Sequence, residues 1–175
     1  MTKIDFYIAP ESKNDAADNI ALSKANSSSN SPTDLSGNLS VNAHWLVACR
    51  VVEKAYRKNM HVYVHMANKP DANAFDALLW SYRPNAFVPH HIENTDAPEC
   101  KVIIGCFNEN PSSEVTKERQ PCELLVNLSG QQPEFFSRYL RLAEVVSANA
   151  EAKSASRERY KYYQDRGYPL AVHQL

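Results

Sequence analysis

The residues with the clearest chemical potential lie near the C-terminal end of the chain. The stretch 153–168, KSASRERYKYYQDRGY, holds five lysines or arginines and four tyrosines. At about 100° per residue, Lys153, Arg157 and Lys161 fall on one face of a helix, and Tyr160 lies among them. Such a face could bind an acidic peptide or a free carboxylate. The alternative is a helix whose cations are solvated and whose tyrosines pack on the rest of the protein.

The remaining residues of this stretch point elsewhere. Arg159, Tyr162 and Arg166 fall on a different side of the helix, where Ala155 indicates contact with the body of the protein. Gly167 is expected to end the helix. The cations are therefore expected to be unevenly distributed around it.

An apolar tail, YPLAVHQL at 168–175, follows the helix and could fold back as a wall beside the basic face. A cationic stripe next to an apolar wall suits an acidic peptide that carries hydrophobic side chains. A long nucleic acid suits it less, because three phosphate contacts give weak, salt-sensitive binding. Direct binding of single-stranded DNA by the helix remains a minor alternative.

A second candidate site is the segment 78–91, LLWSYRPNAFVPHH. It places Trp80, Tyr82, Phe87 and Val88 around two prolines, directly after a predicted helix, where connecting segments usually lie at the surface. Exposed aromatic residues in such a loop are good anchors for a protein interface. The alternative is that these side chains close the core.

The same segment ends in His90 and His91, which prompts the question of a metal site. Adjacent loop histidines could both bind a metal ion, with Cys100 or Cys106 as a further ligand. However, neither the ligand spacing of structural zinc sites nor an HExxH motif is present. Cys49 lies in a helical pattern, and no serine has the context of a nucleophile elbow. A metal- or nucleotide-dependent enzyme that uses His90, His91 and Cys100 is therefore the weaker alternative to a binding protein.

Overall composition argues against a protein that binds nucleic acid over its whole surface. The net charge is −1 and the pI is about 6.6, so no general attraction to phosphate backbones is expected. The four cysteines form no CxxC pair and are too sparse for a disulfide scaffold. Because neither an export signal nor a membrane-length apolar run of about 20 residues is visible, we expect a cytoplasmic protein with reduced thiols.

Apolar periodicity predicts strands that alternate with helices. The expected strands are 3–9, 60–66, 101–107 and 123–128, and the expected helices are 40–58, with Ser40 as N-cap and Asn59 as the stop, and 71–82. In 60–66, Val62 and Val64 face one way while His61, Tyr63 and His65 face the other. Short apolar runs in such alternation indicate an α/β fold with a mostly parallel central sheet and helices on both faces. The stretch 134–147 fits either a helix or a strand.

We expect a single α/β domain over 1–175, with a flexible Ser/Asn-rich loop at 23–38 and a basic helix and tail at 151–175. The chain has only four glycines, and neither GxGxxG nor GxxxxGK[ST] occurs. Without such a loop, the sequence encodes no backbone cradle for a pyrophosphate. We therefore expect no cofactor and interpret the sheet as a scaffold for protein contacts.

Two segments together resemble one protein family. DALLWSYRPNAFVPHH at 76–91 and RERYKYYQDRGY at 157–168 look like the chi subunits of bacterial DNA polymerase III. The resemblance extends over 3–9 and 40–172, and the loop at 23–38 looks like an insertion relative to the family.

The resemblance implies a Rossmann-like three-layer fold without nucleotide chemistry. It also implies a short helix near 133–139 followed by a strand near 141–147. It further implies a non-enzymatic adaptor of the clamp-loader assembly in DNA replication. Its partners would be the psi subunit, with which it would form a heterodimer, and the acidic C-terminal tail of single-stranded-DNA-binding protein. Through them it would associate with the clamp loader and coated single-stranded DNA, and not with a membrane.

The resemblance also assigns residues. Arg157 could form two parallel hydrogen bonds with a carboxylate, whereas a lysine acts as a point charge. Tyr160 would pack against the apolar end of the tail. The implied tail-binding residues are Lys153, Arg157, Tyr160, Lys161 and Val172, and the implied psi-facing residues are Trp80, Phe87, Val88 and Pro89.

Overall fold

The computed structural model describes residues 1–10, 43–93, 100–106 and 123–174. The loop predicted at 23–38, the N-cap predicted at Ser40 and Cys122 lie outside the described residues. In the ranges that are described, no helix combines the length and the apolar character needed to cross a membrane.

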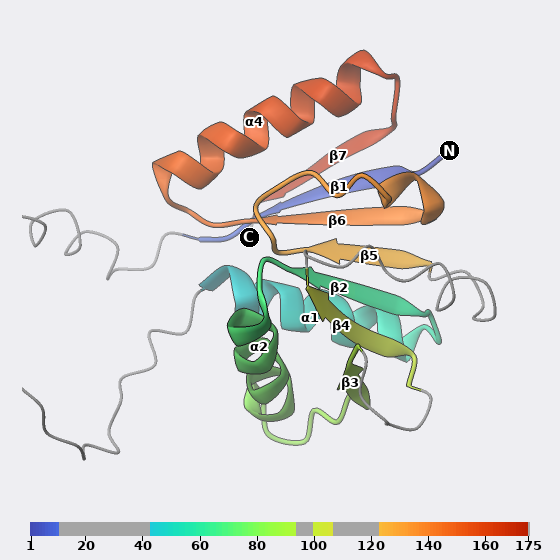
Figure 1. Cartoon of the computed structure of the whole chain (residues 1–175), viewed down its shortest axis with the longest axis vertical. Helices are drawn as coiled ribbons and strands as arrows, with labels where there is room; N and C mark the ends of the chain where they lie inside the picture. The colour runs from blue at the N-terminus through green and yellow to red at the C-terminus, as the bar shows by residue number, and fades with distance from the viewer. Residues whose placement is uncertain (11–42, 94–99, 107–122, 175) are drawn as a thin grey trace, which may run out of the picture.

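The described strands form one sheet in which every pairing is parallel. Their order across the sheet is β3-β4-β2-β5-β6-β1-β7 (Figure 1). The prediction of a mostly parallel α/β sheet is thus confirmed. The strands are β1 (Lys3–Ile8), β2 (Val62–Met66), β3 (His90–Ile92), β4 (Val102–Cys106), β5 (Leu124–Asn127), β6 (Arg141–Val146) and β7 (Leu170–Gln174).

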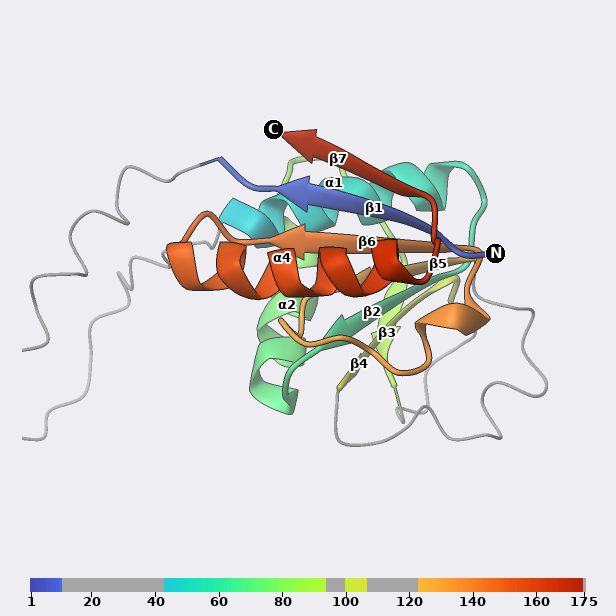
Figure 2. The same cartoon turned by 90° about the horizontal axis from the view of Figure 1, so that it is seen from above.

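Helices cover both faces of this sheet, which makes the fold three-layered. Helices α1 (Ala43–Arg57) and α2 (Lys69–Ser81) pack into the core on one face, and α4 (Ala150–Asp165) packs into the core on the other. Figure 2 shows α1 and α4 on opposite sides of β1 and β6. A short 3-10 helix, η1 (Phe136–Arg138), lies between β5 and β6.

The strands read as short apolar runs because both of their faces are buried. In β2, Val62 and Val64 belong to the core beneath α1 and α2, while Tyr63 belongs to the core beneath α4. This is the alternation predicted from the sequence, since successive side chains of a strand point to opposite faces.

The helix ends follow from local chemistry. Asn59 has a φ of 64°, the left-handed conformation that ends α1 as predicted. Helix α2 begins at Lys69, two residues before its predicted start at 71. The reason is that Asn68 is the N-cap, and its side chain accepts a hydrogen bond of 2.8 Å from the backbone N–H of Asp71.

Two segments differ from what the residue pattern alone indicated. His90 and His91, interpreted as loop residues, begin the short strand β3, which pairs with β4. The ambiguous stretch 134–147 contains η1 and then β6, in agreement with the division that the family resemblance implied. The tail that follows α4 adds β7 beside β1.

Candidate protein-binding sites

A buried carboxylate fixes α4 against the sheet. Glu144 of β6 is fully buried, and the Nε of Arg159 lies 3.2 Å from its Oε2. Tyr163 donates a hydrogen bond of 2.9 Å to Oε1, and Asn127 donates one of 3.0 Å to Oε2. Arg159 also donates to the carbonyl of Gly130 at 2.7 Å. Because these contacts join α4 to β5, β6 and the turn after β5, they set the rotation of the helix about its axis.

The electrostatics of this network follow from its burial. Burial raises the pKa of Glu144, while the charge of Arg159 and the hydrogen bonds from Tyr163, Asn127 and Arg159 act in the opposite direction. Burial and the neighbouring Glu144 likewise raise the pKa of Tyr163, which therefore remains a hydrogen-bond donor. Removing either Arg159 or Glu144 alone would lower the stability of the fold, because the other would stay buried without its countercharge.

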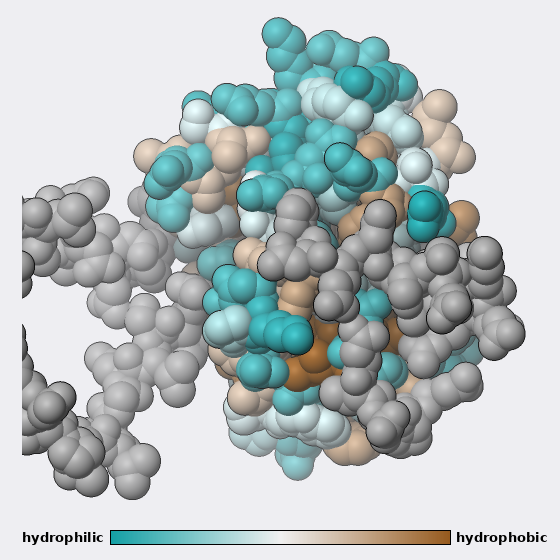
Figure 3. Space-filling model, in the orientation of Figure 1, coloured by the Kyte–Doolittle hydropathy of each residue, from teal (hydrophilic) through white to brown (hydrophobic). Residues whose placement is uncertain are grey.

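With Arg159 and Tyr163 turned inward, the predicted cationic face of α4 points outward. Arg157 and Lys161 are exposed, and Lys153 and Tyr160 are half-buried. The spacing of four residues places the three cations on successive turns of one face. Figure 3 shows the hydrophilic surface at the top of the molecule, where α4 lies in Figure 1.

The C-terminal strand β7 places Val172 on the face of the sheet that α4 covers. The ring of Tyr160 lies 5.4 Å from the ring of Phe6 on β1. Val172 is the register partner of Phe6 on β7, so the two side chains share the α4 face of the sheet. Val172 is 51% exposed. Val172 thus lies at the edge of the sheet, on the same face as the Phe6 ring on which Tyr160 packs.

The second candidate surface is a pair of aromatic rings at the end of α2. Trp80 is 46% exposed and Phe87 is 70% exposed, and their ring centroids are 5.6 Å apart. We call these two residues the aromatic pair. Pro89 is half-buried, whereas Val88 is only 1% exposed and belongs to the core. Val88 therefore supports this surface from below and is not part of it.

His90 has a supporting role beneath the aromatic pair. Its ring centroid lies 4.3 Å from that of Trp80. Its Nδ1 is 2.6 Å from the carbonyl oxygen of Val88, and its Nε2 is 3.3 Å from the carboxylate of Asp76. Both ring nitrogens of His90 therefore have protein partners, and its ring packs on Trp80.

The residues considered for metal or thiol chemistry are not arranged for it. His90 and His91 are adjacent on a strand, so their side chains point to opposite faces of the sheet. Among residues 1–10, 43–93, 100–106 and 123–174, no group of three or more histidine, cysteine or acidic side chains is placed to hold a metal ion. Cys49 is buried, and burial raises the pKa of its thiol to about 12, which opposes formation of a reactive thiolate.

Reasoning from the sequence missed two features of these sites. One is Phe6, the ring on which Tyr160 packs. The other is the Glu144 network. The signal for the second was the glutamate within the otherwise apolar run LAEVV of β6, since a buried charge requires a partner.

Comparison with known proteins identifies the family. Residues 35–171 match the family model described as DNA polymerase III chi subunit, HolC. A relative from Pseudomonas aeruginosa named DNA polymerase III subunit chi is 33% identical over 175 residues, which is the whole chain and 98% of the relative. A Haemophilus influenzae protein of the same name is 27% identical over 128 residues, 72% of this chain and 83% of that protein. The corresponding Escherichia coli protein is 22% identical over 124 residues, 71% of this chain and 80% of that protein.

The match covers Lys153, Arg157, Tyr160 and Lys161 of α4 and the aromatic pair, whereas Phe6 and Val172 lie outside it. The chain therefore belongs to the family of DNA polymerase III chi subunits.

Proposed function

We propose that this protein is a non-enzymatic adaptor subunit of the DNA polymerase III clamp-loader assembly, acting in the cytoplasm during DNA replication. It binds the psi subunit through the aromatic pair and the acidic C-terminal tail of single-stranded-DNA-binding protein through α4 and β7. The membership in a family of polymerase subunits supports an accessory role. The observation that carries the tail-binding role is the position of Tyr160 and Val172 beside Phe6, next to the cations of α4.

Each group at the α4 site has a distinct task. The guanidinium of Arg157 pairs with the terminal carboxylate of the tail through two parallel hydrogen bonds. Lys153 and Lys161 attract the acidic residues that precede this terminus. The apolar side chain at the end of the tail packs between Tyr160 and Val172, so charge and hydrophobic contact are recognised together.

The aromatic pair provides the contact with psi. Large, exposed aromatic side chains are over-represented among residues that contribute most to protein interfaces. Trp80 is braced by His90 from below, so little side-chain freedom is lost when a partner packs on it. The aromatic pair comes from α2 and the following loop, away from α4, so the two partners can bind together (Figure 1).

A short tail on an open surface binds weakly, with a dissociation constant in the micromolar range, or about −8 kcal/mol. Coated DNA presents many tails, so avidity raises the overall affinity without new contacts. The adaptor can therefore hold the polymerase assembly on coated template and still exchange between tails.

Replacing Arg157 with alanine tests the tail-binding role. We expect the affinity for a tail peptide, measured by isothermal titration calorimetry, to fall by about 1.5–3 kcal/mol, because a charge-assisted hydrogen-bonded contact is lost. Arg166→Ala, which removes the same charge at the end of the same helix, serves as the matched control. Increasing salt should weaken binding of the unmodified protein. Equal affinity of the Arg157→Ala and unmodified proteins would rule out this site.

A further inference from the structure

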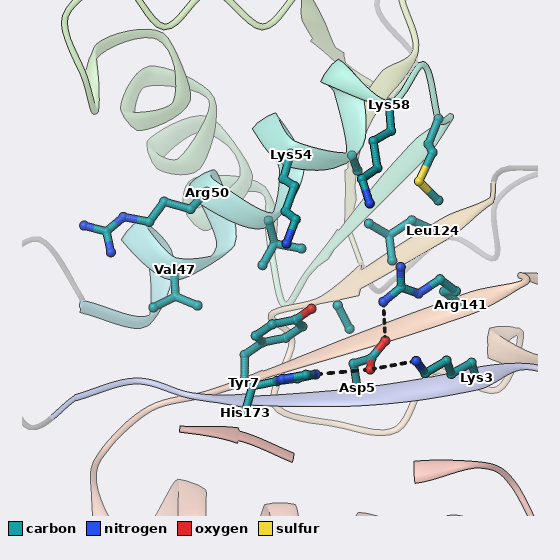
Figure 4. Close-up of a pocket in the computed structure, with 14 residues that line it drawn as sticks. Lys3, Asp5, Tyr7, Val47, Arg50, Lys54, Lys58, Leu124, Arg141 and His173 are labelled. Carbon is teal, nitrogen blue, oxygen red and sulfur yellow. Dashed lines mark hydrogen bonds and ion pairs between the residues drawn. The ribbon is translucent and has the colours of Figure 1, made fainter. Parts of the chain in front are cut away.

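A second cationic site lies on the face of the sheet opposite α4. It is a cavity of about 370 Å³, which we call the groove, between α1 and the strands β1, β5, β6 and β7. Asp5 is the single carboxylate among its described lining residues, and the remaining charges are positive. The lining lysines and arginines are Lys3, Arg50, Lys54, Lys58 and Arg141 (Figure 4).

The carboxylate of Asp5 is already engaged. It lies 2.6 Å from Arg141, 3.2 Å from His173 and 3.8 Å from Lys3. Burial would raise the pKa of Asp5, but the hydrogen bonds from Arg141 and His173 and the positive charges of its neighbours outweigh this and hold the pKa below its ordinary value. Asp5 thus organises the floor of the cavity, and most of the positive charge above it remains available for an anion.

Three cations of α1 and the turn after it line one wall of the cavity. Arg50 and Lys54 stand four residues apart on α1, about 6 Å along the helix axis, and Lys58 follows in the turn directly after the helix. The side chains of Lys54 on α1 and of Lys58 in the turn after it reach toward the sheet, where Arg141 lies (Figure 4). Lys3 and Arg141 line the side of the cavity formed by the sheet. Several cations spread over two facing walls suit a linear polyanion better than a single phosphate.

An aromatic platform on the floor indicates which polyanion. The rings of Tyr7 and His173 are stacked, with centroids 4.8 Å apart and an interplanar angle of 19°. Both rings line the cavity, and His173 lies on the edge strand β7. A basic groove combined with aromatic rings is the arrangement by which proteins bind single strands, because every base has a face that can stack. An acidic peptide would use the charges but not the rings.

We propose that this groove binds a short segment of single-stranded DNA, with the phosphates along α1 and a base against the Tyr7–His173 stack. This proposal is independent of the tail-binding role, because the groove and the α4 site lie on opposite faces of the sheet. One molecule can therefore bind a protein tail and the adjacent DNA strand at the same time.

Fluorescence anisotropy with a labelled oligothymidylate of about 12 nucleotides, at low salt, tests the proposal. The double variant Lys54→Ala/Lys58→Ala should bind about tenfold more weakly. The slope of its log affinity against log salt concentration should be smaller in magnitude by about 1.4, since two phosphate contacts are lost. The matched control, Arg157→Ala/Lys161→Ala, removes two cations from the opposite face and should leave both values unchanged.

An oligomer of equal charge that lacks bases separates DNA binding from general attraction of anions. It should bind more weakly than oligothymidylate, because it cannot stack on the rings. Three results would overturn the proposal: equal binding of the two oligomers, loss of binding in the α4 control variant alone, or no binding of oligothymidylate at low salt. None of these results bears on the affinity for the tail peptide, which is measured separately.

Discussion

Replacing Arg159 with alanine is expected to lower the free energy of unfolding by about 3–5 kcal/mol. The substitution removes the cation that lies 3.2 Å from the buried carboxylate of Glu144 and also the hydrogen bond to the carbonyl of Gly130. The buried carboxyl group of Glu144 would then keep its hydrogen bonds from Tyr163 and Asn127 but have no countercharge. Chemical denaturation followed by circular dichroism would measure the loss.

Two further variants make this prediction specific. Arg157→Ala removes an exposed cation from the same helix, so its free energy of unfolding should stay within about 0.5 kcal/mol of the unmodified protein. Replacing both members of the pair, Glu144→Leu with Arg159→Met, should recover part of the stability: no buried charge remains, but Tyr163 and Asn127 lose the acceptor to which they donate. If Arg159→Ala proved as stable as Arg157→Ala, the network would not be what holds α4 in place.

Replacing Phe87 with alanine is expected to weaken binding of the psi subunit by about 2–4 kcal/mol, or roughly 30- to 1,000-fold. Phe87 is 70% exposed, so its ring contributes little to the core and is available to a partner. Trp80 should show a similar effect, but it also packs on His90. The Phe87 variant is therefore the cleaner one. Surface plasmon resonance with immobilised psi would give both affinities.

Leu140→Ala is the matched control for this experiment. Leu140 is a large apolar residue of comparable exposure, 63%, in the segment between η1 and β6. Its removal should leave psi binding unchanged. Equal losses for Leu140→Ala and Phe87→Ala would indicate general hydrophobic attraction, and no loss for Phe87→Ala would place the psi contact elsewhere.

The regular parts of the fold could be predicted because they depend on local periodicity. The continuous apolar runs of β4 and β5 indicated strands buried on both faces, and the chain alternates these with helices. Strand β3 was missed because it has only three residues, and its pairing with β4 cannot be read from its own pattern. The predicted start of α2 at 71 is two residues late because the helix begins at Lys69 with Pro70 in its first turn, where a proline is tolerated.

In the candidate sites, too, the features that depend on local pattern could be predicted, and those that depend on contacts between distant segments could not. The cationic face of α4 follows from helix geometry alone, so the predicted set of Lys153, Arg157 and Lys161 did not need a structure. The position of Val172 beside Phe6, on the α4 face of the sheet, depends on the pairing of β7 with β1, which joins segments far apart in the sequence. Similarly, Val88 is adjacent to Phe87 but points into the core, a difference that the aromatic composition of the loop did not reveal.

The central claim, that α4 and β7 together bind an acidic tail, is tested most directly by an amide NMR titration of the labelled protein with a tail peptide. The predicted result is that chemical-shift changes concentrate at residues 153–161 and 170–174 and are lost when the peptide's terminal carboxylate is amidated. Changes centred on Arg50, Lys54 and Lys58 instead, with α4 and β7 unaffected, would contradict the claim.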